Sequence, residues 1–247
     1  MTRDTVRLFG LRIDNLTMGE TIARINQMIE KGGVHQHVVV NVDKVVKASR
    51  DPQIADIVNE CDLVNVDGQP VVWASRLLGQ PLKERVTGID LMVRLVEESA
   101  KTGHRLYFLG AKKEILEQTV RWARAQGAHI AGYRDGYFKA DDENAVADEV
   151  AASEADILFM AVPSPKKEIF LNKYKERMGA AFVMGVGGSF DVVAGKVERA
   201  PVWLQRSGLE WFYRLYQEPR RMWRRYLVED AAFVPLVLRE LTRRGAA

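Results

Sequence analysis

Short apolar runs alternate with longer amphipathic stretches through most of this 247-residue chain. The runs are rich in β-branched residues and predict strands at residues 36–42, 62–67, 105–111, 129–133, 156–162 and 181–186. The stretches between them carry apolar residues on one face and predict helices at residues 17–30, 89–101, 115–126, 141–152 and 165–178. Strands that alternate with helices indicate an α/β fold with a mostly parallel sheet flanked by helices.

The composition excludes several classes of protein. Apolar residues make up 47% of the chain and charged residues 28%, as in ordinary globular proteins. No apolar run approaches the roughly 18–20 residues of a membrane-spanning helix, and the first residues lack the apolar stretch of a signal peptide. A single cysteine, Cys61, cannot form an internal disulfide. We therefore expect a protein of a reducing compartment.

The net charge is divided unevenly along the chain. Residues 199–247 contain ten arginines, no lysine and five acidic residues, a net charge of +5, whereas residues 1–198 carry −2. Eight of the 21 aromatic residues also lie in this last segment. We therefore divide the chain into a core, residues 1–199, and a helical appendage, residues 200–247. Such an appendage suits a phosphate-bearing ligand, a nucleic acid or an anionic membrane surface.

Three helices are predicted in the appendage. One covers residues 207–217, a second opens at Pro219, and a third covers residues 231–241, kinked or starting late because of Pro235. Arginines four residues apart share helical faces there, and they alternate with aromatic residues. A solvated helix surface is the alternative interpretation. The absence of lysine and the aromatic residues favour contact with anionic headgroups.

Polar residues and glycines follow the predicted strands, where α/β proteins bind ligands. Asp67 at one strand end could accept a proton from an attacking hydroxyl, or could form an Asx-type turn or a cap. Asn41, at a neighbouring strand end, has the same two interpretations. The turn Gly185-Val-Gly-Gly188 could let backbone amides approach a phosphate, or could be a tight strand-to-helix turn.

Other chemistries find little support in the sequence. Phe190 stands where a dinucleotide-binding motif needs its third glycine, and no Walker motif is present. The four histidines lack metal-ligand spacing, His35 and His37 are expected at an exposed strand start, and no Asp-x-Asp motif occurs. We therefore expect no metal and no cofactor. A diphosphate would have to be neutralised by cationic side chains and backbone amides.

An ordered set of motifs extends over nearly the whole chain. It comprises Asn41-Val-Asp43, Asp67-Gly68, Glu84-Arg-Val-Thr-Gly-Ile-Asp90, Phe108-Leu-Gly-Ala111, Gly136-Tyr-Phe138, Ser164-Pro-Lys-Lys-Glu168, Gly185-Val-Gly-Gly-Ser-Phe-Asp191, Ala194-Gly-Lys196, Arg199-Ala-Pro201, Leu209-Glu-Trp211, Tyr213-Arg-Leu215, Glu218-Pro-Arg220 and Arg224-Arg-Tyr226. With this set the chain resembles the WecG/TagA/CpsF family of bacterial glycosyltransferases. The resemblance implies a Rossmann-like core with a C-terminal helical appendage.

The resemblance also implies a reaction and its partners. Family members invert the anomeric centre and need no metal as they move a sugar, typically N-acetylmannosamine, from a UDP-sugar to a polyprenyl-diphosphate-linked sugar. They build cell-surface polysaccharides at the inner face of the cell membrane. We therefore expect a UDP-sugar donor, a lipid-linked acceptor and peripheral attachment to the cytoplasmic membrane, without nucleic acid. The sequence leaves open a homo-oligomer formed through the appendage.

Site residues follow from the matching positions. Asp67 matches the proposed general base, with Asn41 and Lys167 beside it. The nucleotide-sugar positions are Arg85, Asp90, Gly136, Tyr137, Gly185, Gly187, Gly188 and Asp191, and the diphosphate or membrane positions are Arg214, Arg221 and Arg224.

Two positions depart from the family pattern. Val39 replaces a common threonine and Lys167 a common glutamine, so the sugar is N-acetylmannosamine or another hexose. A nicotinamide-dependent oxidoreductase and a non-enzymatic membrane- or RNA-binding module remain alternatives.

Overall fold

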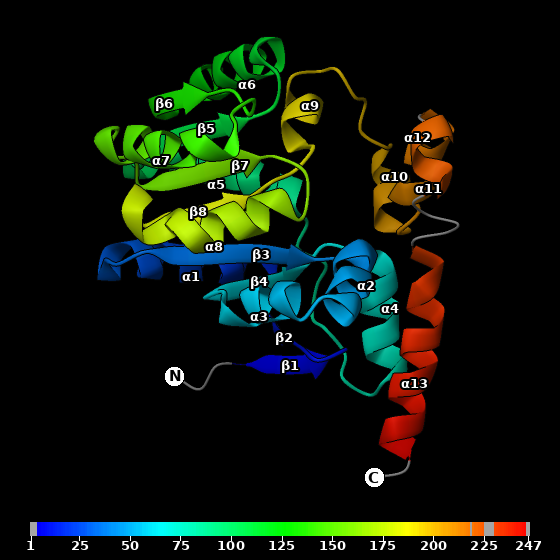
Figure 1. The fold of residues 1–247 in the computed structure, drawn as a ribbon. Helices are drawn as coiled ribbons and strands as arrows, with labels where there is room; N and C mark the ends of the chain where they lie inside the picture. The colour runs from blue at the N-terminus through cyan, green and yellow to red at the C-terminus, as the bar shows by residue number, and fades with distance from the viewer. Residues whose placement is uncertain (1–3, 218, 225–229, 246–247) are drawn as a thin grey trace.

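The centre of the molecule is a six-stranded parallel sheet. The computed structural model describes residues 4–217, 219–224 and 230–245. The strand order is β4-β3-β8-β7-β5-β6, and every pairing is parallel (Figure 1). The strands are β3 (His35–Val40), β4 (Leu63–Val66), β5 (Arg105–Gly110), β6 (His129–Arg134), β7 (Ile157–Ala161) and β8 (Phe182–Gly185). The six strands predicted from the apolar runs are confirmed, and so is the α/β class.

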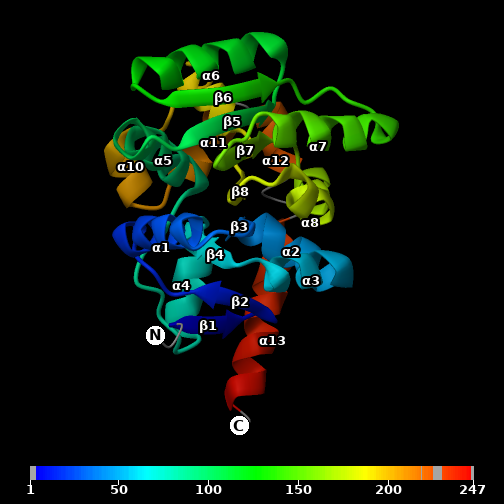
Figure 2. The same ribbon diagram turned by 90° about the vertical axis from the view of Figure 1, so that its left-hand side faces the viewer.

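Helices cover both faces of this sheet, as Figure 2 shows from the side. One face carries α1 (Met18–Lys31), α5 (Gly88–Thr102), α6 (Lys113–Ala125) and the short α9 (Ser189–Val193). The other carries α2 (Val42–Arg50), α3 (Pro52–Glu60), α7 (Glu143–Ala152), preceded by the 3₁₀ turn η1 (Ala140–Asp142), and α8 (Lys166–Met178). The five helices predicted for the core are thus present, with ends shifted by a few residues.

Alternate residues of each strand enter opposite cores. Phe108 and Phe159 pack under α1, α5 and α6, whereas Leu109 and Leu158 pack under α7 and α8, and all four are buried. A strand covered on both faces reads as a continuous apolar run rather than an alternating pattern. This explains why these strands could be recognised from the sequence.

Several elements were not predicted. An antiparallel hairpin, β1 (Thr5–Leu8) and β2 (Leu11–Asp14), precedes the first helix. Asp14 attaches it to the body, because its carboxylate accepts a hydrogen bond from the Val64 amide at 2.8 Å. Helices α2, α3 and α4 (Gln69–Leu77) were also missed. The first core strand ends at Val40, two residues earlier than predicted, because Asn41 caps α2.

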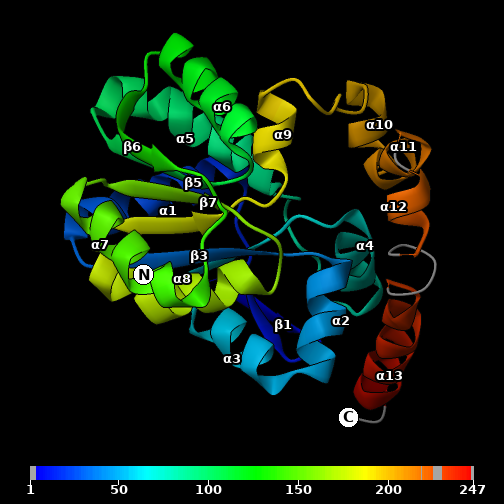
Figure 3. The same ribbon diagram turned by 45° about the horizontal axis from the view of Figure 1, so that its top comes forward.

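The appendage begins beside the carboxyl ends of the strands. Figures 1 and 3 show α10 (Val202–Arg206), α11 (Glu210–Gln217) and α12 (Pro219–Arg224) at this edge of the body. The helix predicted at residues 207–217 starts only at Glu210, because Gly208 adopts a positive φ of 77° in the turn before it. Pro219 opens α12 as predicted.

The last helix of the appendage runs back along the body. A 3₁₀ turn, η3 (Asp230–Ala232), leads into α13 (Phe233–Gly245), which starts late and keeps Pro235 in its first turn. Phe233 is buried, with its ring centroid 5.2 Å from that of Phe9 in the hairpin turn. Arg244 donates a hydrogen bond to the carbonyl of Arg7 at 2.8 Å. The division of the chain at residue 199 stays a prediction.

Candidate active site

A pocket of about 850 Å³ opens at the carboxyl ends of the strands. The segments after β3, β4, β7 and β8 line it, together with the segment before α5 and parts of the appendage. Nine of the predicted site residues lie in its wall: Asn41, Asp67, Arg85, Tyr137, Lys167, Gly185, Gly187, Gly188 and Asp191. The parallel topology therefore brings together groups that are up to 150 positions apart in the sequence.

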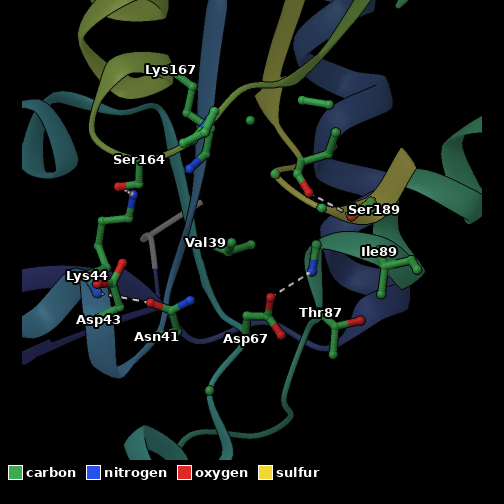
Figure 4. Close-up of a pocket in the computed structure, with 18 of the residues that line it drawn as sticks. Val39, Asn41, Asp43, Lys44, Asp67, Thr87, Ile89, Ser164, Lys167 and Ser189 are labelled. Carbon is green, nitrogen blue, oxygen red and sulfur yellow. Dashed lines mark hydrogen bonds between the residues drawn. The ribbon is translucent and has the colours of Figure 1, made fainter. Parts of the chain in front are cut away.

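Asn41 and Asp67 lie side by side at the ends of β3 and β4 (Figure 4). Asn41 caps α2, since its Oδ1 accepts the Lys44 amide at 3.0 Å. The capping alternative is thus correct for Asn41, although the residue also lines the pocket.

Asp67, unlike Asn41, does not cap a helix. The N-cap of α4 is Gly68, and Asp67 Oδ2 accepts the Gly88 amide from across the pocket at 3.4 Å. A Cβ on Gly68 would lie 3.1 Å from the Asn41 Cα, so glycine lets the two strand ends approach closely without a shift of the backbone. The Asp67 carboxylate is thereby held at the pocket wall.

The glycine turn after β8 is shaped by the side chain of Lys167. A Cβ on Gly185 would lie 2.9 Å from Lys167 Cδ and Cε. The Lys167 stem therefore passes close over the strand end, and a larger residue at position 185 would displace it. Gly187 has a positive φ of 54°, and the Ser189 hydroxyl closes the turn by donating to the Val186 carbonyl at 2.7 Å. The tight-turn interpretation is correct, and the turn also lines the pocket, whereas the approach of its backbone amides to a phosphate stays a prediction.

Two charged residues of the pocket were missed by the sequence analysis. Lys44 and Glu168 are both buried, and the Lys44 ammonium pairs with Glu168 Oε1. Lys167 lies 2.6 Å from the same oxygen. Burial would raise the pKa of Glu168, but the two ammonium groups outweigh it and lower this pKa to about 2. Glu168 is therefore ionised and a poor proton acceptor.

For Lys44, the sequence contained a signal. Acidic residues are favoured in the first turn of a helix, because the peptide dipoles make that end positive. Lys44 and Lys167 nevertheless stand in the first turns of α2 and α8. Lysines that follow strand ends at helix starts point to an anionic ligand more strongly than lysines elsewhere on a helix.

Ion pairs join the pocket rim to the appendage. Arg199 forms two hydrogen bonds with the Asp90 carboxylate, at 2.6 and 2.8 Å. Arg85 reaches Glu210 at 3.4 Å and donates to the Gln205 carbonyl at 3.3 Å. Burial would raise the pKa of Asp90, but hydrogen bonds from Arg199 and Thr87 lower it on balance. Asp90 thus holds Arg199, the last residue of the core, whose Nε lies 3.9 Å from Glu210 of the appendage. Asp90 is outside the pocket lining, so its predicted contact with the nucleotide sugar stays a prediction.

The remaining predicted residues divide into two groups. Gly136 supports the turn before Tyr137, donating its amide to the Ala111 carbonyl at 3.0 Å, and it does not line the pocket. Arg214 falls on α11, and Arg221 and Arg224 fall on α12, but these three side chains lie outside the described part of the chain. Their predicted roles at diphosphates or membranes remain predictions.

The two histidines of β3 differ in environment. The prediction of an exposed strand start is wrong for His37, which is buried and whose Nε2 pairs with Asn65 Oδ1 at 3.0 Å. Burial lowers the pKa of His37 to about 4. Within residues 4–217, 219–224 and 230–245 no three His, Cys, Asp or Glu side chains form a metal-binding group. No helix among the described residues has the length and apolar character needed to cross a membrane.

Comparison with known proteins identifies the family. Residues 6–247 match the model described as the Glycosyl transferase WecG/TagA/CpsF family. One relative is the N-acetylglucosaminyldiphosphoundecaprenol N-acetyl-beta-D-mannosaminyltransferase of Bacillus spizizenii, 39% identical over 192 residues, which cover 77% of this chain and 74% of the relative. A protein of the same name from Bacillus subtilis is 36% identical over 190 residues, covering 76% and 73%. With nearly its whole length matched, the chain belongs to the WecG/TagA/CpsF family and is a glycosyltransferase.

Proposed function

We propose that this glycosyltransferase moves a hexose from a UDP-sugar to a polyprenyl-diphosphate-linked sugar in cell-surface polysaccharide synthesis. The names of both relatives describe transfer of N-acetylmannosamine to N-acetylglucosaminyldiphosphoundecaprenol. The observation that carries the proposal is the pocket itself, which combines the Asp67 carboxylate with lysines and a glycine turn. Family membership favours this function over a nicotinamide-dependent oxidoreductase or a non-enzymatic binding module.

The reaction is a direct displacement that inverts the anomeric carbon. The acceptor hydroxyl oxygen forms the new bond to this carbon, and its proton passes to Asp67. The bond to the diphosphate oxygen breaks, and UDP leaves with the electron pair. Position accounts for most of the contribution of Asp67, because a carboxylate is a weak base and acts here by being held beside the attacking hydroxyl. The glycine turn and Lys167 stabilise the departing diphosphate.

The donor sugar is N-acetylmannosamine or another hexose. Val39 lines the pocket, and its methyl groups lie 3.6 and 3.8 Å from the position of a Cβ on Gly88. A valine cannot donate a hydrogen bond to a sugar hydroxyl, so the Val39 side chain contributes only shape and apolar contact to the pocket. A panel of UDP-sugars therefore has to be compared directly.

The appendage attaches the enzyme to the inner face of the cell membrane, where a polyprenyl-linked acceptor is available. Exposed aromatic side chains support this proposal: Trp203, Phe212, Tyr216 and Trp223. Aromatic and arginine side chains together favour an anionic interface. Cosedimentation with vesicles containing anionic lipid tests the attachment, and equal binding to purely zwitterionic vesicles would contradict it. Whether the enzyme also forms a homo-oligomer stays a prediction.

The test of function is transfer from UDP-sugars to a polyprenyl-diphosphate N-acetylglucosamine analogue, followed by product mass. We expect transfer from one hexose donor, at a rate unchanged by a metal chelator. Asp67→Asn should retain UDP affinity and lose about 10²–10⁴-fold in turnover, the usual contribution of a general base. Full turnover in this variant would exclude Asp67 as the base. No transfer from any UDP-sugar by the unaltered enzyme would exclude the proposed reaction.

A further inference from the structure

Two lysines from neighbouring helices meet at one carboxylate inside the pocket. Lys44 extends from α2 and Lys167 from α8, and Figure 4 shows both side chains on the same side of the pocket. Both ammonium groups contact Glu168 Oε1. The Lys44 side chain is 4% exposed, that of Lys167 12% and that of Glu168 3%. This is a buried charge cluster within the wall of the site.

The cluster carries more positive than negative charge. Two ammonium groups share one carboxylate, and the neighbouring carboxylate of Asp43 is already paired with Lys47 at 2.9 Å. Lys44 donates in addition only to the Ser164 hydroxyl, at 3.3 Å, among the residues that the structure describes. At least one N–H of each ammonium is therefore available to a ligand. Buried charge without a partner is costly, so the excess charge favours binding of an anion.

The position of the lysines on their helices adds to this imbalance. Lys44 is the third residue of α2 and Lys167 the second of α8, where the helix dipole favours negative groups. In the protein without a ligand, neither burial nor the dipoles of the two helices therefore stabilise the charged forms of Lys44 and Lys167. A ligand with two negative phosphate groups would be stabilised both by the ammonium groups and by the helix N-termini.

We propose that Lys44 and Lys167 together bind the diphosphate of the UDP-sugar donor, and that Glu168 is the positioning residue that holds both ammonium groups toward it. This proposal rests on the proposed function and adds Lys44 and Glu168 to the donor site. The donor is favoured over the acceptor as the source of the diphosphate, because the Lys167 stem crosses Gly185 in the glycine turn.

The protonation of Lys44 offers an independent measurement of the site. Burial, and then repulsion from Lys167, lower the pKa of Lys44 to about 8, with partial compensation by Glu168 and Asp43. Cys61 also interacts with Lys44, but burial raises the pKa of this thiol to about 12, which leaves it neutral. A bound diphosphate favours charged Lys44. UDP affinity should therefore fall about tenfold from pH 7 to pH 9, as Lys44 loses its proton in the free enzyme.

The experiment compares the affinities of UDP and uridine, which differ only in the diphosphate. In the full-length enzyme, Lys44→Met and Lys167→Met should each weaken UDP binding about 10- to 100-fold, the usual effect of losing a hydrogen bond to a charged group. Uridine affinity should stay within about twofold, because the base and ribose contacts remain. Lys101→Met is the matched control, since Lys101 is exposed at the end of α5 and should change neither affinity.

Two further variants separate positioning from structure. Lys44→Arg keeps its charge at high pH, so its ratio of UDP to uridine affinity should not change between pH 7 and pH 9. Glu168→Gln should lower this ratio while uridine affinity stays unchanged. Thermal unfolding confirms that each variant is folded at the temperature of the binding assay.

The outcomes distinguish this inference from the proposed function. If the unaltered enzyme binds UDP and both methionine variants bind it equally well, the diphosphate site is wrong while the function stands. Equal losses for UDP and uridine would indicate a structural role and would also overturn the inference. If only the KM for the acceptor analogue rises, the lysines bind the acceptor, and the donor assignment is wrong. If the unaltered enzyme binds no UDP, the proposed function itself fails.

Discussion

Removing the carboxylate from the buried charge cluster should be among the most destabilising single changes in this protein. Glu168 is 2% exposed and Lys44 3%, and Glu168→Gln would leave two ammonium groups with only a neutral amide between them. Breaking a buried ion pair by removing one partner costs about 3–5 kcal/mol. We expect a loss of about 3 kcal/mol at pH 7, at the lower end, because Lys167 can turn toward water in the pocket.

A second variant tests whether the cost comes from unpaired charge. In Lys44→Met/Glu168→Gln the buried cation is removed together with its partner, so about 2 kcal/mol of the loss should return. Urea unfolding followed by circular dichroism gives the free energy of unfolding for Lys44→Met, Glu168→Gln, the double variant and the unaltered chain. A loss below about 1 kcal/mol in Glu168→Gln would refute the reasoning. So would a double variant whose loss equals the sum of the two single losses.

The pH dependence of stability follows from the same group. The pKa of Glu168 is about 2 in the folded protein and 4.5 for the ordinary side chain. Its contribution to stability is therefore present above about pH 4.5 and is lost as the pH falls toward 2. The difference in free energy of unfolding between the unaltered chain and Glu168→Gln, here called the stability gap, should decrease as the pH falls over this interval. A gap that stays constant down to pH 2.5 would contradict the assignment.

Other substitutions test the surroundings of the site. Gly185→Ala places a methyl 2.9 Å from the Lys167 stem, so we expect UDP affinity to fall about tenfold with little change in uridine affinity, measured by calorimetry. Unchanged UDP affinity would mean that the position of Lys167 does not matter for binding. Phe233→Ala removes a buried ring between α13 and the hairpin and should cost about 3–5 kcal/mol in urea unfolding. A loss below about 1 kcal/mol would show that α13 contributes little to stability.

Burial on two faces decided which parts of the fold could be predicted. The run from Ile157 to Ala161 is entirely buried, so its sequence is apolar at every position and indicates a strand. The hairpin strands have four residues each and include Arg7 and Arg12, which leaves no comparable pattern. Helices α2 and α3 are amphipathic, but with nine residues each they are shorter than the window of about 11–18 residues in which a helical period is recognised.

The location of the site could be predicted from the sequence, but only some of its residues could. Parallel topology brings strand ends together, so Asn41, Asp67 and the glycine turn were expected at one edge. Lys44 and Glu168 lie on helices that present charged residues at many positions, and such charges ordinarily face water. Only the three-dimensional structure, in which the Lys44 side chain of α2 meets Glu168 of α8, reveals that these two charges are buried together.

The contact between α13 and the hairpin has a consequence for synthesis of the chain. The hydrogen bond from Arg244 to Arg7 joins residues 237 positions apart, and Phe233 and Asp230 belong to the pocket wall. During translation, the sheet and its helices emerge from the ribosome well before residues 230–245. Until then the apolar surface beneath α13 is exposed and the pocket lacks part of its wall. A nascent chain that has not yet exposed α13 therefore lacks both this part of the pocket wall and the contact that joins α13 to the hairpin.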